Sequence, residues 1–522
     1  MAALVALVSV LPGVLFLPAT DRSEARLAEA SAQMLEDRDF AAATVDDDLR
    51  DTSPLAAHWL QAGSVAATSD PEARHIWAFR IPAVLGAMIA AAACAWGGAA
   101  LFGPSAGFLD GVILGGGTLV TGAGVVDAPG ALLCAGVTLA IAALARLRLA
   151  HEGAFQAGRR TRALFWMGLS LAVAAAGVVG AATVILTICA LWLVERRAGW
   201  LASLGWGWGL IVLAALAGPS LVAGAIDGGP PAPMGWLIAG SGERTPGLQF
   251  LLAPLLLTPF ALLLPAGIAR LGALRDPSMR ITACWLIPAW LMMEFARGPS
   301  PARGLIAYGA LAWLCAAAVQ DGVGLIAARL GAALQALTAA VLAAGLLYLA
   351  ERFGAPGALV WAGVAAGLVA AAGLGGAALL LKGRTGLAAA LAAVLGLAAH
   401  GAAFAGLAPR LQSLWVANRI VRVLGAAGLD PREGVTPGPV AVTGFGEPSL
   451  DFALGGQTES MSPEEAAAAV RTGRPAIVEA RQEDAFLAAV RGGGPVRRAG
   501  EAEGFDYASG ETVRLEIYAP GR

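Results

Sequence analysis

The sequence has little charge for a chain of its length. Of 522 residues only 14% are Asp, Glu, Lys or Arg, and Lys382 is the single lysine. A water-soluble globular chain carries about 25% charged residues. The formal net charge of −2 also excludes the basic surface that nucleic-acid phosphates require. We therefore expect neither a soluble globular fold nor a nucleic-acid partner.

Cysteine and histidine are also rare, and neither is arranged as a site. The five cysteines all lie within apolar runs, so no disulfide framework is expected. The four histidines are far apart and lack the spacing of metal ligands. We expect no metal site from these residues and no cofactor, and the sequence leaves a requirement for a divalent cation open.

Apolar residues are in excess, at 57% of the chain, and they gather in long runs. Since a helix needs about 20 apolar residues to cross a bilayer, these runs predict an all-α polytopic membrane protein with about 13 transmembrane helices. The first run, 2–18, has no basic region and no Ala-x-Ala cleavage site, so we interpret it as a retained helix rather than a signal peptide. The others are expected near 80–102, 107–125, 129–147, 163–178, 180–195, 201–225, 249–269, 281–296, 304–319, 324–349, 357–381 and 385–407.

The arginines between these runs predict the orientation of the chain. They gather around 146–162, 196–197, 270–280 and 382–384, which fall on one side of the membrane if the spans alternate. Positively charged loops stay in the cytoplasm, so the N-terminus is predicted to be cytoplasmic. An odd number of spans then places the C-terminal part in the periplasm. We predict a multi-pass protein of a bacterial inner membrane, with the lipid bilayer as its surroundings.

Two polar parts of the chain lie on that outer side. The loop 19–79 contains two amphipathic stretches, which we predict to be helices on the membrane surface. After residue 407, short strand and helix patterns alternate. The chain is thus predicted to have a transmembrane domain, 1–407, and a small soluble α/β domain, 408–522. The predicted helices are Asp21–Glu36, Pro54–Ala67, Ser462–Arg471 and Gln482–Val490, and the predicted strands are Val440–Phe445, Ala476–Val478 and Thr512–Tyr518.

Ionisable side chains near the outer ends of the spans are the candidates for chemistry, because they are costly there unless they face water or a cavity. A carboxylate can accept the proton of an attacking hydroxyl or amine, and arginine binds phosphate oxygens with a fork of donors. Asp127 stands out because apolar residues flank it closely. The predicted catalytic residues are Asp21, Glu24 and Asp127, and the predicted substrate-binding residues are Arg22, Arg26, Arg50, Asp51, Arg244, Arg297 and Arg303.

Several segments resemble one family of membrane enzymes. The first outer loop begins LPATDRSEARLAEASAQMLEDRDF at Leu17, and VVDAPGALLCAG follows at Val125. With DPSMRITACWLIPAWLMMEF at Asp276 and GFGEPSLDF at Gly444, these segments are similar to the superfamily of 4-amino-4-deoxy-L-arabinose transferase and dolichyl-phosphate-mannose protein mannosyltransferase, of the GT-C fold. The resemblance implies a glycosyltransferase that moves a sugar from a polyprenyl-phosphate donor to a lipid, glycan or protein acceptor on the periplasmic face.

The resemblance also assigns residues, and the chain departs from it at some of them. Glu24 matches one carboxylate of the family's acidic pair, and Asp127 matches a second acidic position. Ser23 stands where the other carboxylate of the pair is expected. The family's lysines beside proline are replaced, for example by Ser53 before Pro54. Asp21 would substitute for the missing carboxylate, and the arginines of the outer loops would substitute for the missing lysines.

These departures leave an alternative open. A serine hydroxyl is not ionised near neutral pH, and each lost charge-assisted contact to phosphate costs about 1.5–3 kcal/mol. The alternative is a catalytically degenerate protein of the same fold that binds lipid-linked sugar, or a partner, without transfer. A transporter is the third possibility, but transporters have interrupted spans and charges near the membrane midplane, whereas the charges here gather at the outer rim.

Overall fold

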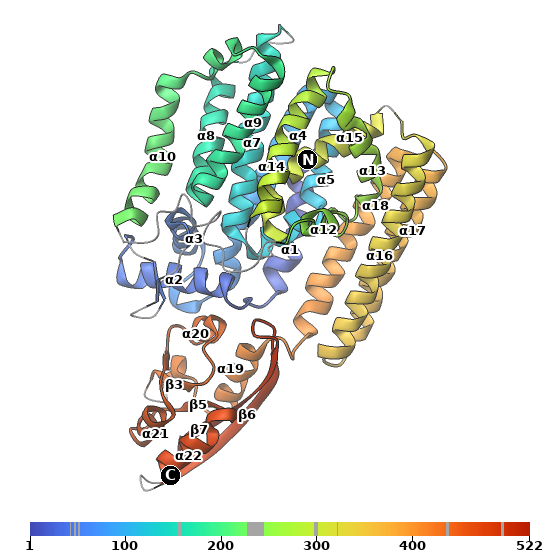
Figure 1. Ribbon diagram of the computed structural model, residues 1–522. Coiled ribbons are helices and arrows are strands. Elements are labelled where there is room, and N and C mark those ends of the chain that lie inside the picture. Colours follow the sequence, from blue (N-terminus) through green and yellow to red (C-terminus); the bar gives the residue numbers. More distant parts are fainter. Residues whose placement is uncertain are drawn as a thin grey trace.

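In the computed structural model, the apolar runs form a bundle of long helices, and the C-terminal part forms a separate sheet domain (Figure 1). The structure describes residues 1–41, 43–45, 49–50, 53–153, 158–226, 245–296, 301–320, 322–434, 438–491 and 495–521. Three predicted binding residues, Asp51, Arg244 and Arg297, lie outside these ranges. For Arg50 and Arg303 only the backbone is described.

Within the described residues, seven helices are long and apolar enough to cross a membrane, and two further spans are bent pairs of shorter helices. Every run predicted from the sequence coincides with a helix or a bent pair, which confirms a multi-pass helical membrane protein; the number 13 stays a prediction. The helices are α1 (Ala2–Phe16), α4 (Ile76–Phe102), α5 (Pro104–Gly116), α6 (Thr118–Val126), α7 (Ala128–His151), α8 (Arg159–Ala176), α9 (Val178–Glu195), α10 (Trp206–Ile226), α12 (Leu248–Leu256), α13 (Leu264–Ala269), α14 (Pro277–Phe295), α15 (Tyr308–Gln320), α16 (Leu325–Phe353), α17 (Ala358–Leu381) and α18 (Thr385–Gly401).

The centre of the bundle is α7, which packs between α4 and α8. In the most apolar 18-residue stretch of α7, 83% of the residues are buried, against 17% in that of α10 at the edge of the bundle. The α7–α8 contact depends on small residues, since a Cβ at Gly136 would lie 2.4 Å from the backbone of Ala172, and one at Gly168 would lie 2.6 Å from that of Ala140. Because a bilayer drives no helix association by hydrophobicity, such close backbone packing has to hold the helices together.

The two bent spans meet inside the bundle, and a threonine hydroxyl donates a hydrogen bond to a backbone carbonyl there. Thr118, at the 54° bend between α5 and α6, donates its backbone N and its Oγ1 to the carbonyl of Thr258, each at 2.9 Å. Nearby, Ser9 Oγ lies 2.6 Å from Thr121 Oγ1 and 2.9 Å from His400 Nδ1. Interrupted spans are tolerated in membranes only where the freed backbone groups find such partners. Sequence reasoning did not place these breaks.

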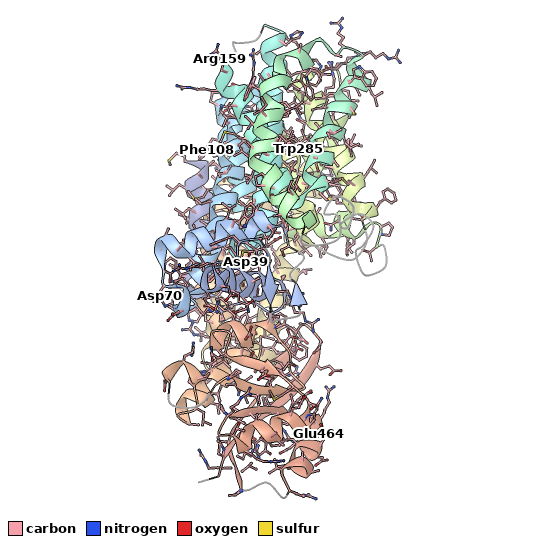
Figure 2. All side chains as sticks on the ribbon, turned by 90° about the vertical axis from the view of Figure 1, so that its left-hand side faces the viewer. Asp39, Asp70, Phe108, Arg159, Trp285 and Glu464 are labelled. Atoms are coloured by element: carbon pink, nitrogen blue, oxygen red, sulfur yellow. The ribbon has the colours of Figure 1, made fainter. Side chains whose placement is uncertain are left out.

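At the end of the bundle away from the sheet domain, an ion cluster ties three helices together. Arg148 of α7 binds Glu195 of α9 at 2.6 Å, and Arg280 of α14 binds the same carboxylate at 3.3 Å. Figure 2 places Arg159 at this end, opposite Glu464 of the sheet domain. The arginine-rich loops at 146–162, 196–197 and 270–280 therefore share one face, as predicted, while its cytoplasmic location stays a prediction. The opposite end is called the outer end below.

The segment after α1 forms the outer end of the bundle and lies between it and the sheet domain (Figures 1 and 2). Both amphipathic helices predicted there are present, as α2 (Ser23–Asp37) and α3 (Leu55–Thr68). A two-stranded ribbon, β1 (Thr44–Val45) with β2 (Leu49–Arg50), and a 3-10 turn, η1 (Pro71–Ala73), complete the segment. On one side α2 packs against α3, and on the other against the sheet domain.

The C-terminal part is the small α/β domain that the sequence predicts. Its five strands have the order β4-β3-β5-β7-β6, with β3 parallel to β4 and β5, and β7 antiparallel to β5 and β6. Sequence reasoning found three strands and two helices but missed β4, β6, α19 and α20; the domain boundary at 407 stays a prediction. The elements are α19 (Val416–Ala426), η8 (Pro431–Glu433), β3 (Val440–Thr443), α20 (Pro448–Leu454), β4 (Thr458–Ser460), α21 (Pro463–Arg471), β5 (Ala476–Glu479), α22 (Glu483–Val490), β6 (Val496–Asp506) and β7 (Glu511–Pro520).

Candidate functional site

Glu24, in the first turn of α2, has a buried carboxylate whose two oxygens are both bound. Arg80 of α4 donates from Nε to Oε1 at 2.6 Å and from Nη2 to Oε2 at 3.0 Å. Thr20 donates its backbone N and its Oγ1 to Oε2, each at 2.8 Å. The side chain of Glu24 is 4% exposed and that of Arg80 is 1% exposed. In this arrangement Glu24 holds the start of α2 in place.

Arg80 explains why the chain needs a buried charge pair here. The carbonyls at the end of α1 and just after it have few backbone partners, although that of Gly13 also accepts from the backbone N of Leu17. Unbound carbonyls near hydrocarbon are costly. Arg80 supplies their donors, and Glu24 balances its charge. Sequence reasoning did not single out Arg80, although an arginine inside an apolar run was the available signal. The carbonyls that it binds, at 2.6–3.3 Å, are those of Gly13, Val14, Leu17 and Pro18.

Asp21 faces the sheet domain. Its backbone N donates to Tyr507 Oη at 2.5 Å, and its side chain is hydrogen-bonded to Ser449. Burial raises the pKa of Asp21, the Ser449 hydrogen bond opposes that rise, and the charge of Asp506 adds to it. The carboxyl is therefore held at a junction between two parts of the chain, where its proton affinity is increased.

Other contacts fasten the same junction. Arg22 donates to Glu447 Oε1 at 3.1 Å, and the rings of Phe79 and Phe452 meet edge to face at 5.3 Å. Arg26, one turn further along α2, is exposed. Of the predicted binding residues with described side chains, Arg22 thus serves the domain junction, and Arg26 is accessible from solution.

The docking of the sheet domain is expected to depend on pH. Burial raises the pKa of Asp21 and of Glu447, so each carboxyl binds its proton more tightly in the folded protein. Their contribution to stability is therefore greatest at low pH and declines as the pH rises through the raised values. We expect the melting temperature of Asp21→Asn to exceed that of the wild type by about 2–4 °C at pH 7.5, and the difference to shrink toward pH 4.5. A constant difference across this pH range, measured by scanning fluorimetry in detergent, would contradict the assignment.

Asp127 begins α7. Its Oδ1 accepts a hydrogen bond from the backbone N of Gly130 at 2.9 Å, and Pro129 follows within the first turn. This is the arrangement of an N-cap aspartate with proline at the start of a helix. Within the described chain, Oδ2 of Asp127 accepts no hydrogen bond. The helix cap therefore accounts for Oδ1 of Asp127, and the role of Oδ2 stays a prediction.

The 3-10 turn η5 (Pro301–Ile306) packs beside the start of α7. A Cβ at Gly130 would lie 2.9 Å from Leu305 of this turn. The same turn carries Arg303, so the fold brings the backbone of one predicted binding residue to the helix end that holds Asp127. The backbone of η5 thus lies beside the helix end that carries Asp127, and the roles predicted for these two residues stay predictions.

A cavity of about 540 Å³ lies between the outer end of the bundle and the sheet domain. Neither Asp21, Glu24 nor Asp127 lines it. In the described parts of the chain, no group of three or more His, Cys, Asp or Glu side chains could hold a metal ion. The residues around the cavity are Pro18, Ala19, Arg74, Ile76, Pro409, Gln412, Trp415, Asn418, Val421, Arg422, Arg432, Phe452 and Ala453.

Comparison with solved structures finds similarity over the whole chain. The chain is similar to ArnT from Cupriavidus metallidurans in the apo state, with a TM-score of 0.77, 16% sequence identity, and 100% of this chain and 98% of that chain covered. The same protein bound to undecaprenyl phosphate gives a TM-score of 0.74 at 17% identity, with 100% and 98% covered. No protein-family model and no curated protein sequence matches the chain.

The fold of this chain is therefore similar to that of ArnT, as the resemblance in the sequence predicted. The similarity includes the sheet domain, because it covers the chain from end to end.

Proposed function

We propose that this protein is an integral-membrane glycosyltransferase that uses a polyprenyl-phosphate sugar as its donor. The observation that carries the proposal is the fold, which matches ArnT along the full length of both chains. One of the two ArnT structures is bound to undecaprenyl phosphate, which supports a lipid phosphate of this class as the donor's carrier. The lipid, glycan or protein acceptor, the periplasmic face and the bacterial inner membrane are parts of the same proposal.

In the proposed reaction, a hydroxyl or amine of the acceptor attacks the anomeric carbon of the donor. The bond from that carbon to the phosphate oxygen breaks, and polyprenyl phosphate leaves with the bonding electrons. The acceptor's proton passes to a carboxylate, for which Asp127 Oδ2 is the best-placed candidate because Oδ1 alone makes the helix cap. Arginines of the outer end, Arg26 and Arg303 among them, would stabilise the departing phosphate.

Asp21 and Glu24 act indirectly in this proposal. Glu24 and Arg80 set the position of the start of α2, and Asp21 joins that start to the sheet domain. Both oxygens of Glu24 are bound, and the carboxyl of Asp21 is buried at the domain junction with one oxygen unbound, so Asp127 is the proposed base. The family's carboxylate is replaced by Ser23 in this chain, so a variant at this position tests the proposal directly.

A second candidate, the catalytically degenerate protein, is favoured by two observations. Ser23 is exposed and cannot supply a carboxylate, and both oxygens of its neighbour Glu24 are bound. Such a protein would bind a lipid-linked sugar without transferring it. Transport is not favoured, because the interrupted spans belong to a fold that is similar to ArnT throughout.

A Ser23→Asp variant distinguishes the two candidates. Purified wild type and variant are compared in proteoliposomes that contain undecaprenyl phosphate bearing a radiolabelled 4-amino-4-deoxyarabinose or mannose, with cell-envelope extract as the acceptor. If the protein is a transferase, the wild type releases the label above the protein-free background, and Ser23→Asp changes the rate less than about tenfold. If the wild type releases no label above background and only Ser23→Asp is active, the protein is catalytically degenerate, since a catalytic carboxylate contributes about 10²–10⁴-fold to the rate.

A further inference from the structure

His400, in the last turn of α18, is an ionisable side chain that the proposed reaction does not use. It is half-buried, and α18 has no Asp, Glu, Lys or Arg. Around it, α1, α6, α17 and the π-helical turn η6 (Ala402–Leu407) have no ionisable side chain, and α5 has only Asp110, which packs against Gly98 of α4. An ionisable group is costly in an apolar span, so a role for it is expected.

The imidazole stands in the middle of a chain of hydrogen bonds. Nδ1 of His400 lies 2.9 Å from Oγ of Ser9, which lies 2.6 Å from Oγ1 of Thr121. Nε2 lies 3.5 Å from Oγ1 of Thr118, which donates to the backbone carbonyl of Thr258 at 2.9 Å. The chain therefore joins α18 to α1, to the first turn of α6 at two points, and to the bend between α12 and α13.

The direction of each bond follows from Thr118. Its single hydroxyl proton points at the carbonyl of Thr258, so its oxygen can only accept from the imidazole. Nε2 of His400 therefore carries the proton, and Nδ1 accepts from Ser9. Ser9 has then used its proton and accepts one from Thr121. A doubly protonated ring would require Ser9 to turn, and within the described residues it would have no ion-pair partner. The neutral Nε2–H tautomer fits the chain.

The helix that this chain holds, α6, is short and is not held in line by α5. It has nine residues, and the 54° bend separates the two helices. Small residues let α1 pack closely along it, since a Cβ at Gly124 would lie 2.7 Å from Val10, and one at Gly13 would lie 2.6 Å from Val125. The position of α6 is therefore set by α1 and by the hydrogen-bond chain.

Asp127, the proposed base, follows the last residue of α6. Its backbone N donates to the carbonyl of Ala123, in the last turn of that helix, at 3.0 Å. A shift or rotation of α6 therefore moves Asp127 with it. A base has to lie within hydrogen-bond reach of the proton that it accepts, and a displacement of about 1 Å can slow a reaction about 10²-fold.

We propose that His400 is a positioning residue of the transferase: as the neutral Nε2–H tautomer, it fixes α6 and thereby the place of Asp127. The kinetic consequence rests on the proposed function, whereas the tautomer and the hydrogen-bond chain do not depend on it. Because His400 acts on the base and not on the donor, its loss lowers kcat and leaves KM almost unchanged.

The first test is the tautomer, which is observed without any substrate. Full-length protein labelled with ¹⁵N at histidine is reconstituted in lipid and measured by solid-state NMR, and the His400 signals are those lost in His400→Gln. We expect one protonated Nε2 and one unprotonated Nδ1, unchanged between about pH 6 and pH 8 and shifted in Ser9→Ala. A proton on Nδ1, or titration of the ring within that range, would overturn the assignment.

The second test compares kcat and KM for transfer of the radiolabelled sugar. His400→Leu is expected to lower kcat about 10²-fold with KM within about twofold, and His400→Gln to recover at least about tenfold, because its amide can replace the Nε2 donor. The matched control is His151→Leu, at an exposed histidine at the other end of the bundle, which should leave both constants unchanged.

A milder pair of variants serves if His400→Leu does not fold. Thr121→Val removes one hydroxyl of the chain and should lower kcat about tenfold. Thr183→Val is its control, because Thr183 is buried on α9 and bonds only the carbonyl of Val179 in its own helix, at 2.9 Å. Melting temperatures of the two variants should agree.

The outcomes separate this inference from the proposed function. An inactive wild type overturns the proposed function and the role in transfer together, whatever the tautomer. An active wild type in which His400→Leu and Thr121→Val keep their kcat overturns the positioning role alone. A rise in KM in place of a fall in kcat would also overturn it, since it would show a role in binding the donor.

Discussion

Replacing Arg80 by methionine is expected to lower the free energy of unfolding by about 3–5 kcal/mol, the usual cost of leaving one partner of a buried ion pair uncompensated. The variant leaves Glu24 charged and buried, with only Thr20 as a donor. It also removes every side-chain donor to the last carbonyls of α1. The measurements are the melting temperature in detergent and the yield of monodisperse protein after gel filtration.

The control for this prediction is Arg26→Met, since Arg26 lies on the same helix as Glu24 but is exposed. Its effect on stability should stay within about 0.5 kcal/mol. The double variant Glu24→Met with Arg80→Met is expected to be more stable than Arg80→Met alone, because no isolated charge remains. If the double variant were the less stable of the two, the buried pair would not be the cause.

Asp127→Asn is expected to reduce transfer about 10²–10⁴-fold while leaving stability almost unchanged. Asparagine caps a helix about as well as aspartate, so the bond to the backbone of Gly130 should survive. It cannot accept a proton near neutral pH, so the proposed base is removed. The variant therefore separates the two roles of one side chain. The measurements are transfer of the radiolabelled sugar and the melting temperature of the purified protein.

Asp127→Ala is the matched comparison, because it removes both the cap and the base. It should lose activity to the same extent and should also lose about 1 kcal/mol of stability, the usual value of an N-cap. Full activity in Asp127→Asn would show that the residue acts only as a helix cap. In that case the base would have to be sought elsewhere, with Asp21 the next candidate.

The sequence predicted the membrane helices because hydrophobic length is a local property. The runs predicted at 129–147 and 357–381 are apolar over the thickness of a bilayer, and their ends agree with those of α7 and α17 to within a few residues. The helix predicted over Ser462–Arg471 is local in the same way: it is present as α21, and Ser462 and Glu465 form a capping box at its start. Strand β6 was missed because its alternation is interrupted by Gly500 and Gly504 and because its surface is polar.

The candidate site shows the limit of such reasoning. Charged residues at the outer end were identified from the sequence, but their partners were not, since partners such as Arg80 for Glu24 and Tyr507 for Asp21 are 56 and 486 residues away. The same is true of His400, whose partner Ser9 is 391 residues away. No role was predicted for His400 or Arg80, although both are ionisable residues within apolar runs.

By itself, the sequence predicted that this chain enters a membrane many times, that a small α/β domain follows, and that the order of its segments resembles that of the GT-C fold. These properties depend on hydrophobic length, periodicity and local motifs, which neighbouring residues specify. Only the tertiary structure decided that both oxygens of Glu24 are bound, whereas one oxygen of Asp21 is buried without a hydrogen-bond partner and one oxygen of Asp127 caps a helix. The reason is physical: whether a charge is free depends on the groups that folding brings beside it, and those come from distant parts of the chain.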